Sequence, residues 1–145
     1  MKEVIQKSKK DSPMLKGYNK ILVTGGAGFM GRHLVDALLS LDKEVLVFDN
    51  LSAEMNGNIS VGAKMTKGDV RNLRQVIQTT KGVDLIFHLA ANANGTVSVN
   101  DPRFDFETNA VGTFNVLDAA LHARVKRLVY VSSASVYGTP VFSNR

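Results

Sequence analysis

Cysteine is absent from this 145-residue chain, and histidine occurs only three times. Without cysteine the chain has no disulfide framework, zinc–thiolate site or catalytic thiol, which suits the reducing cytoplasm that we expect as its location. His33, His88 and His122 lie far apart and none falls in a ligand pattern with a carboxylate, so no metal site is predicted. No apolar run approaches the roughly 20 residues of a membrane span, and no membrane partner is expected.

Positive charge is concentrated at the start of the chain, whose formal net charge is +5. Residues 1–20 hold six lysines against two acids, whereas residues 21–145 hold twelve basic and eleven acidic side chains. Residues 1–19 therefore predict a basic, flexible tail, either solvated or in weak contact with an anionic surface, and they lack the apolar run of a signal peptide. Because residues 20–145, the predicted domain, are nearly neutral, nucleic acid is not an expected partner.

Short apolar runs alternate with segments of helical period from Lys20 onward. Strands are predicted over 20–25, 44–50, 63–69, 84–91 and 126–133, and helices over 31–41, 71–80 and 102–123. This alternation is typical of βαβ units around a parallel sheet that is buried on both faces. Right-handed crossovers give the strand order 3-2-1-4-5, the larger part of a Rossmann-type, doubly wound α/β sheet.

The long helix has a clear start and an apolar stripe. Asp101 is the expected N-cap, and Pro102 occupies the first helical position, where its missing N–H costs nothing. Apolar residues then recur three or four positions apart, at Phe106, Ala110, Phe114, Leu117 and Leu121. This spacing predicts one continuous apolar face along the helix.

Four glycines lie where the first strand meets the first helix, in "TGGAGFMG", and three of them have distinct expected roles. Gly25 suits a tight turn out of the strand, Gly28 permits close approach of a pyrophosphate, and Gly31 permits close packing of the helix on the sheet. The N–H groups at the helix start would then face the phosphates. The alternative is a glycine-rich turn with no ligand.

Two carboxylates follow strands on the same side of the predicted sheet. Asp49 comes eighteen positions after Gly31, where it can accept hydrogen bonds from the adenosine ribose of a dinucleotide and would repel the 2'-phosphate of NADP. The sequence therefore predicts tighter binding of NAD than of NADP, although an acid in a strand-end turn is the alternative. Asp69 lies where an adenine ring would sit, or is an ordinary helix cap.

Together these motifs resemble the extended short-chain dehydrogenases/reductases, the NAD-dependent sugar-nucleotide epimerases and dehydratases. The resemblance rests on "TGGAGFMG", "DNLS", "GDV", "HLAA", "DPRFDFETNAVGTFNVLDAA" and "VSSASVYG", in that order. It implies a cofactor site that also includes Phe29, Met30, Asn50, Val70, Leu89, Ala90, Ala91 and Asn109. It further implies that Ser133 hydrogen-bonds the reacting sugar oxygen as a catalytic residue, with Ser135 near the sugar.

The segments "HLAANANGTVSVNDP" and "SSASVYG" are most similar in sequence to the UDP-glucose 4-epimerase branch of the family. The resemblance implies a UDP-hexose as substrate, oxidised at C4 by hydride transfer to NAD and reduced again on the other face. A dTDP-sugar dehydratase and a UDP-glucuronate decarboxylase begin with the same oxidation and are alternatives. In the family the helix at 102–123 also forms a homodimer interface.

The family's catalytic tyrosine, followed four positions later by lysine, is not found in this sequence. The residues four positions beyond Tyr18, Tyr130 and Tyr137 are leucine, alanine and valine. The pair, the remaining strands and the sugar-nucleotide domain would then lie beyond Arg145. We therefore expect NAD binding without turnover, or alternatively a stand-alone NAD-binding sensor or interaction module.

Overall fold

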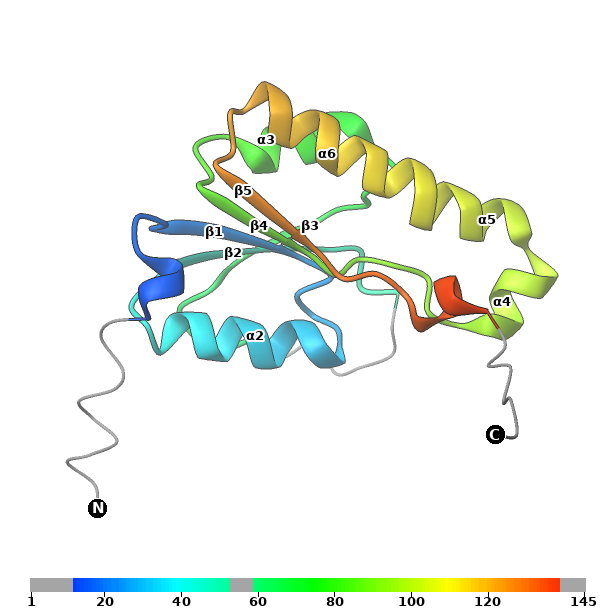
Figure 1. The fold of residues 1–145 in the computed structure, drawn as a ribbon, viewed down its shortest axis with the longest axis horizontal. Coiled ribbons are helices and arrows are strands. Elements are labelled where there is room, and N and C mark those ends of the chain that lie inside the picture. Colours follow the sequence, from blue (N-terminus) through cyan, green and yellow to red (C-terminus); the bar gives the residue numbers. More distant parts are fainter. Residues whose placement is uncertain (1–11, 53–58, 139–145) are drawn as a thin grey trace, which may run out of the picture.

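The structure, a computed structural model, describes residues 12–52 and 59–138 and contains one parallel sheet (Figure 1). Its strands are β1 (Lys20–Thr24), β2 (Glu44–Asp49), β3 (Lys64–Lys67), β4 (Leu85–His88) and β5 (Arg127–Tyr130). They pair in the order β3-β2-β1-β4-β5, and all the pairs are parallel. The predicted Rossmann-type α/β fold and its strand order are confirmed.

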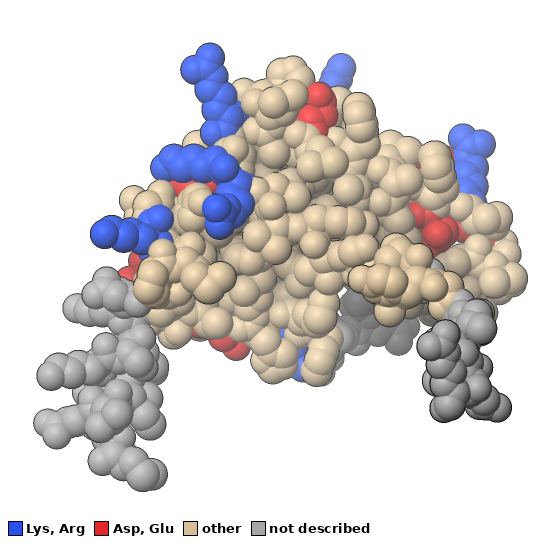
Figure 2. Space-filling view, viewed as in Figure 1, with Lys and Arg blue, Asp and Glu red and all other residues tan. Residues whose placement is uncertain are grey.

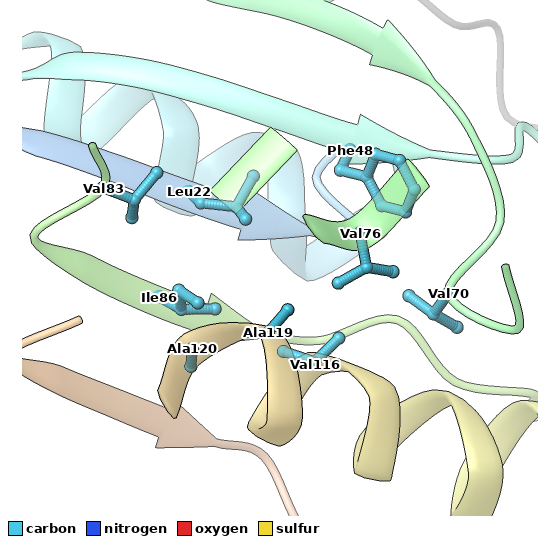
Figure 3. Close-up of a cluster of buried hydrophobic side chains, with 9 residues drawn as sticks. All are labelled: Leu22, Phe48, Val70, Val76, Val83, Ile86, Val116, Ala119 and Ala120. Atoms are coloured by element: carbon cyan, nitrogen blue, oxygen red, sulfur yellow. The ribbon is translucent and has the colours of Figure 1, made fainter. Parts of the chain in front are cut away.

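Helices cover both faces of the sheet. Helix α2 (Phe29–Leu39) lies on one face, and α3 (Leu73–Thr80) and α6 (Gly112–His122) lie on the other (Figure 1). Ile21 and Val23 pack in the cluster on the α2 side, whereas Leu22 between them packs with Val76 of α3 and Val116 of α6 (Figure 3). Successive residues of a strand point to opposite faces of the sheet, so the nearly continuous apolar residues of these strands are buried on both faces.

All five strands end earlier than predicted, and β4 and β5 differ most, by three residues each. β4 ends at His88 and β5 ends at Tyr130, and beyond these ends one further backbone hydrogen bond joins each strand to the sheet, from Leu89 N to Thr24 O and from Val131 N to His88 O. Beyond β4 the chain forms α4 (Gly95–Asn100), a short helix that the sequence pattern did not predict. The segments after the strands are therefore free to form the rim of the sheet's carboxyl edge.

The predicted long helix is present but changes its winding midway. It comprises α5 (Pro102–Phe106), a π-helical turn η2 (Glu107–Val111) and α6. The predicted cap is confirmed, since Asp101 Oδ1 accepts a hydrogen bond from Phe104 N at 2.9 Å and Pro102 follows it. The apolar stripe faces away from the sheet: Phe106, Phe114, Leu117 and Leu121 are all exposed.

Residues 1–11 of the predicted tail lie outside the described residues, whereas its last part packs onto the domain. Leu15 of the 3₁₀ turn η1 (Pro13–Leu15) and Tyr18 pack against the cluster on the α2 side. Asp84 Oδ2 accepts hydrogen bonds from Asn19 N and Lys20 N and fixes the entry into β1. Among the described residues no helix has the length and apolarity to cross a membrane.

Candidate functional site

A cavity of about 1010 Å³ opens at the carboxyl ends of the strands. It lies where the chain reverses direction across the sheet, with β1 between β2 and β4, which is where open α/β sheets bind ligands. Residues predicted to bind a cofactor form much of its lining: Gly25, Gly28, Asp49, Asn50, Val70, Leu89, Ala90 and Ala91. The glycine loop, the end of β2 and the segment after β4 thus face one shared space.

The glycine loop joins β1 to α2 under tight steric constraints. Gly25 has a φ of +69°, and a Cβ atom there would lie 2.7 Å from Ala90 N. A Cβ atom on Gly31 would collide with Gly25 O and lie 2.6 Å from Gly26 Cα. Gly28 is the N-cap of α2 and offers no side chain to its first N–H groups. Gly28 itself lines the cavity, so α2 begins beside it, and helix N-termini of this kind bind phosphates.

Asp49 at the end of β2 is held against the glycine loop. Its Oδ2 accepts a hydrogen bond from Ala27 N at 2.9 Å, and its Oδ1 accepts one from Leu51 N at 2.8 Å. Each carboxylate oxygen has two lone pairs, so both can accept a further hydrogen bond from a ligand hydroxyl. The carboxylate therefore lies where a ribose close to the phosphate loop could be bound.

Asp69, after β3, is fully engaged with neighbouring side chains. Its carboxylate accepts hydrogen bonds from Arg71 N, Nε and Nη2 and from Asn50 Nδ2, at 2.8–3.3 Å. The hydrogen-bonded Arg71 guanidinium holds the pKa of Asp69 at about 2, below its usual value. The alternative interpretation as a helix cap is wrong, because Asn72 caps α3 by accepting a hydrogen bond from Gln75 N.

Asn109 of the π-helical turn fastens the segment after β4. Its Oδ1 accepts a hydrogen bond from Asn92 N at 2.8 Å, and its Nδ2 donates to Asn92 O and to Asp105 Oδ1. The same Asp105 oxygen accepts hydrogen bonds from Asn92 Nδ2 and Ser98 Oγ, both at 2.8 Å. Asn92 lines the cavity, so this cluster sets the position of one cavity wall.

His88 is buried in the core, where its imidazole connects β1 to α6. Its Nδ1 lies 2.6 Å from Thr24 Oγ1 and its Nε2 lies 3.0 Å from Thr113 Oγ1. The Thr113 hydroxyl donates a hydrogen bond to Asn109 O, so it accepts one from Nε2–H of His88. The Thr24 hydroxyl accepts a hydrogen bond from Ala90 N and donates one to Nδ1 of His88. Burial holds the pKa of His88 at about 4, which keeps the imidazole neutral.

Known protein families, sequences and structures include several that are similar to this chain. A model of the NAD dependent epimerase/dehydratase family matches residues 21–143. The chain belongs to this family. The resemblance that the motifs indicated is thereby confirmed.

The members of the epimerase/dehydratase family that the chain is similar to are longer. A putative UDP-glucose 4-epimerase from Methanocaldococcus jannaschii is 38% identical over 83% of this chain and 40% of its own length. The crystal structure of UDP-glucose 4-epimerase from Thermotoga maritima with UDP-glucose matches with a TM-score of 0.80 and 33% identity, over 86% of this chain and 41% of that one. The Brucella ovis enzyme in complex with NAD matches with a TM-score of 0.78 and 31% identity, over 86% and 38%. The chain thus spans about 40% of their length.

Some residues implied by the family resemblance stand apart from the cavity lining. Phe29 and Met30 are exposed at the start of α2. Ser133 is exposed where the chain leaves β5, and Ser135 lies in the next 3₁₀ turn, η3 (Ala134–Tyr137), with its side chain outside the description. Among the described residues, no group of three His, Asp or Glu side chains could hold a metal ion.

The sequence analysis did not predict a further set of residues that line the cavity. They are Phe48, Ser52, Gly68, Asn92, Ala93, Asn94, Gly95, Val97, Phe104 and Thr108. Phe104 and Thr108 are four residues apart on one helix, which places them on the same face. That spacing was a usable signal, but the segment between β4 and α5 carries no periodic pattern from which its cavity residues could be found.

Proposed function

We propose that this chain is the NAD-binding part of a nucleotide-sugar epimerase resembling UDP-glucose 4-epimerase. The observation that carries the proposal is the joining of the glycine loop and Asp49 by the bond from Ala27 N to Asp49 Oδ2. It brings the start of α2 and the Asp49 carboxylate to one cavity, which supports binding of the pyrophosphate by the former and of the adenosine ribose by the latter. The buried Thr108 hydroxyl in the same lining fits a ligand with polar edges.

Each part of the cavity has a distinct task in this proposal. The start of α2 binds the pyrophosphate, and Asp49 accepts hydrogen bonds from the adenosine ribose. Leu89, Ala90 and Ala91 line the second ribose, in a position set by the Asn92–Asn109 hydrogen bonds. NAD, when bound, supplies a hydride acceptor for C4 of a UDP-hexose. Ser133 would hydrogen-bond the sugar oxygen that loses its proton.

NAD should bind to the chain at least about tenfold more tightly than NADP, because the 2'-phosphate would lie against the Asp49 carboxylate. Isothermal titration calorimetry of the two cofactors measures the ratio. The Asp49→Asn variant keeps an acceptor oxygen but removes the charge, so it should bring the two affinities closer together. Equal affinities of the unmodified chain for both cofactors would contradict the assigned role of Asp49.

The same preparation should show no conversion of UDP-galactose to UDP-glucose when NAD is present. Removing a proton from a sugar hydroxyl near neutral pH requires a base with a suitable pKa, and an unperturbed tyrosine titrates near 10. No tyrosine of this sequence has lysine four positions later. Turnover by this polypeptide alone would refute the proposal that it binds the cofactor without catalysing the reaction.

We further propose that the exposed stripe on α5 and α6 binds a second copy of the chain. Phe106, Phe114 and Leu121 are 62%, 65% and 77% exposed, and contiguous apolar surface of this kind favours association. In Figure 2 many of the visible Lys and Arg side chains gather at the end of the molecule where the strands begin. Much of the rest of the surface in this view carries no Lys, Arg, Asp or Glu side chain.

Light scattering should show a molecular mass that rises with concentration, and Phe114→Lys should suppress the rise. The matched control is Met14→Lys, which places the same charge on another exposed apolar residue, in η1. A monomer at every concentration, or equal effects of the two substitutions, would rule out the stripe as the contact.

A further inference from the structure

The amino ends of the strands form one end of the molecule, opposite the carboxyl edge that holds the cavity (Figure 1). Five segments meet there, each preceding or beginning a strand: residues 12–20, 40–44, 60–64, 81–84 and 122–127. They hold eight cations and three acids, a formal net charge of +5, although the predicted domain as a whole is nearly neutral. The cations are Lys16, Lys20, Lys43, Lys64, Lys81, Arg124, Lys126 and Arg127. The fold therefore gathers positive charge that the composition averages out.

Most of these cations have no acidic partner, and Figure 2 shows Lys and Arg side chains gathered at this end. Two of the three acids are already paired, Glu44 with Lys64 at 3.0 Å and Asp84 with Lys126 at 2.7 Å. Among the described residues, four other cations are exposed and form no ion pair: Lys16, Lys81, Arg124 and Arg127. Unpaired cations that lie close together create a positive potential that attracts anions.

The 3₁₀ turn η1 is fastened to the same end of the molecule by two of its lysines. Lys43 Nζ donates a hydrogen bond to Leu15 O, and Lys126 Nζ donates one to Gly17 O, both at 3.2 Å. In this position the side chain of Met14 is 81% exposed. The turn therefore presents an apolar side chain beside the cations.

Val61, shortly before β3, is a second exposed apolar residue at this end. It lies near the loop that contains Lys43, because a Cβ atom on the adjacent Gly62 would be 3.5 Å from Leu39 Cδ2 at the end of α2. Single exposed apolar residues are ordinary. Apolar side chains among unpaired cations, however, match a surface with an anionic outer layer over an apolar interior, which is the surface of an anionic bilayer.

We propose that the amino end of the sheet binds the surface of an anionic phospholipid bilayer. The unpaired lysines and arginines contact lipid phosphates, while Met14 and Val61 enter the headgroup layer. No membrane partner is expected from the sequence because no apolar run could span a bilayer, but that criterion does not address binding at its surface. The cavity opens at the other end of the strands and stays accessible, so the inference does not depend on the proposed NAD site.

A nucleic acid would also be attracted by these cations but matches this end less well. Six of the eight are lysines, whose flexible point charges suit mobile lipid phosphates, whereas arginine is preferred for nucleic-acid recognition. Surfaces that bind single strands add aromatic side chains on which bases stack. Tyr18, the one Phe, Tyr or Trp residue of the five segments, is half-buried, with the Arg127 guanidinium 5.9 Å from its ring centre.

The test is co-sedimentation with vesicles of phosphatidylcholine alone and of equal parts phosphatidylcholine and phosphatidylglycerol, at physiological ionic strength. The unmodified chain should sediment with the anionic vesicles and not with the neutral ones. Lys81→Gln with Arg124→Gln should weaken binding about 25-fold, because each charge near an anionic bilayer contributes about fivefold. The matched control, Lys67→Gln with Arg74→Gln, removes the same charge from exposed residues at the end of β3 and the start of α3, and should bind within about twofold of the unmodified chain.

Met14→Ser tests the apolar part of the contact without changing the charge. It should weaken binding to the anionic vesicles by about fivefold, because methionine would no longer be buried among the headgroups. Unchanged vesicle binding in Met14→Ser, or binding of duplex RNA as tight as that of the anionic vesicles, would assign the surface to polyanions in general and overturn the inference. Equal losses in the two double variants would also overturn it, as would failure of the unmodified chain to sediment with anionic vesicles.

Discussion

Replacing Gly31 with alanine is expected to lower the free energy of unfolding by about 3 kcal/mol, near the upper end for overpacking by a single methyl group. The added Cβ would collide with Gly25 O and lie 2.6 Å from Gly26 Cα. Both are backbone atoms of the loop between β1 and α2, so neither can move aside by changing a rotamer. Relief requires α2 to shift away from the loop, which would also disturb its N-terminus. Urea unfolding monitored by circular dichroism measures the loss.

Gly95→Ala is the matched control for this substitution. Gly95 begins α4, and a Cβ atom there would meet no atom within 4 Å. Alanine at this position should change the free energy of unfolding by less than about 1 kcal/mol, in the stabilising direction, because it restricts the unfolded chain. Equal stability of Gly31→Ala and Gly95→Ala would mean that the loop does not confine α2.

The sheet could be predicted because its signals are local. Apolar runs of strand length, alternating with segments of helical period, are sufficient to place five parallel strands and the crossovers between them. The glycine at position 31 was also predicted, with a packing role. The contact that constrains Gly25 could not be predicted, because it joins that residue to Ala90, sixty-five positions along the chain.

The parts of the site that were missed depend on tertiary contacts. Asp69 precedes a helix, as a capping residue does, yet its partners are Arg71 and Asn50, and only the folded arrangement brings Asn50 to it. The spacing of Phe104 and Thr108 predicts that they share a face of the helix, but it does not predict the π-helical turn or that this face lines the cavity. Sequence reasoning therefore found the loops that surround the cavity better than the helix face that closes it.

Between pH 7 and pH 4 the chain should lose about 3 kcal/mol of its free energy of unfolding through His88. His88 is 1% exposed and stacks on Tyr130, and burial lowers its pKa from 6.5 to about 4. The unfolded state therefore binds a proton that the folded state does not as the pH falls below about 6.5. Stability from the neutral imidazole is complete above that pH and is lost as the pH approaches 4.

The window between pH 6.5 and pH 5 separates this effect from the carboxylates. Asp69, with a pKa of about 2 against 3.8 when unperturbed, contributes stability that is lost only at lower pH. Within the window His88 alone should account for about 2 kcal/mol. Urea unfolding at several pH values measures the slope in the unmodified chain and in His88→Gln, which removes the titration and keeps a donor and an acceptor. His33→Gln, on the exposed side of α2, is the control and should retain the full slope.

Protonation of His88 would also act on the cavity, because both ring nitrogens would then donate. Nε2–H can keep its bond to Thr113, but Nδ1–H would force Thr24 Oγ1 to accept, and the Thr24 hydroxyl hydrogen would lose its acceptor. Thr24 also accepts from Ala90 N at the cavity wall, so the disturbance reaches the segment that is proposed to line a cofactor ribose. His88→Gln should therefore flatten the loss of stability between pH 6.5 and pH 5. An unchanged slope in that variant would show that His88 is not held neutral by burial.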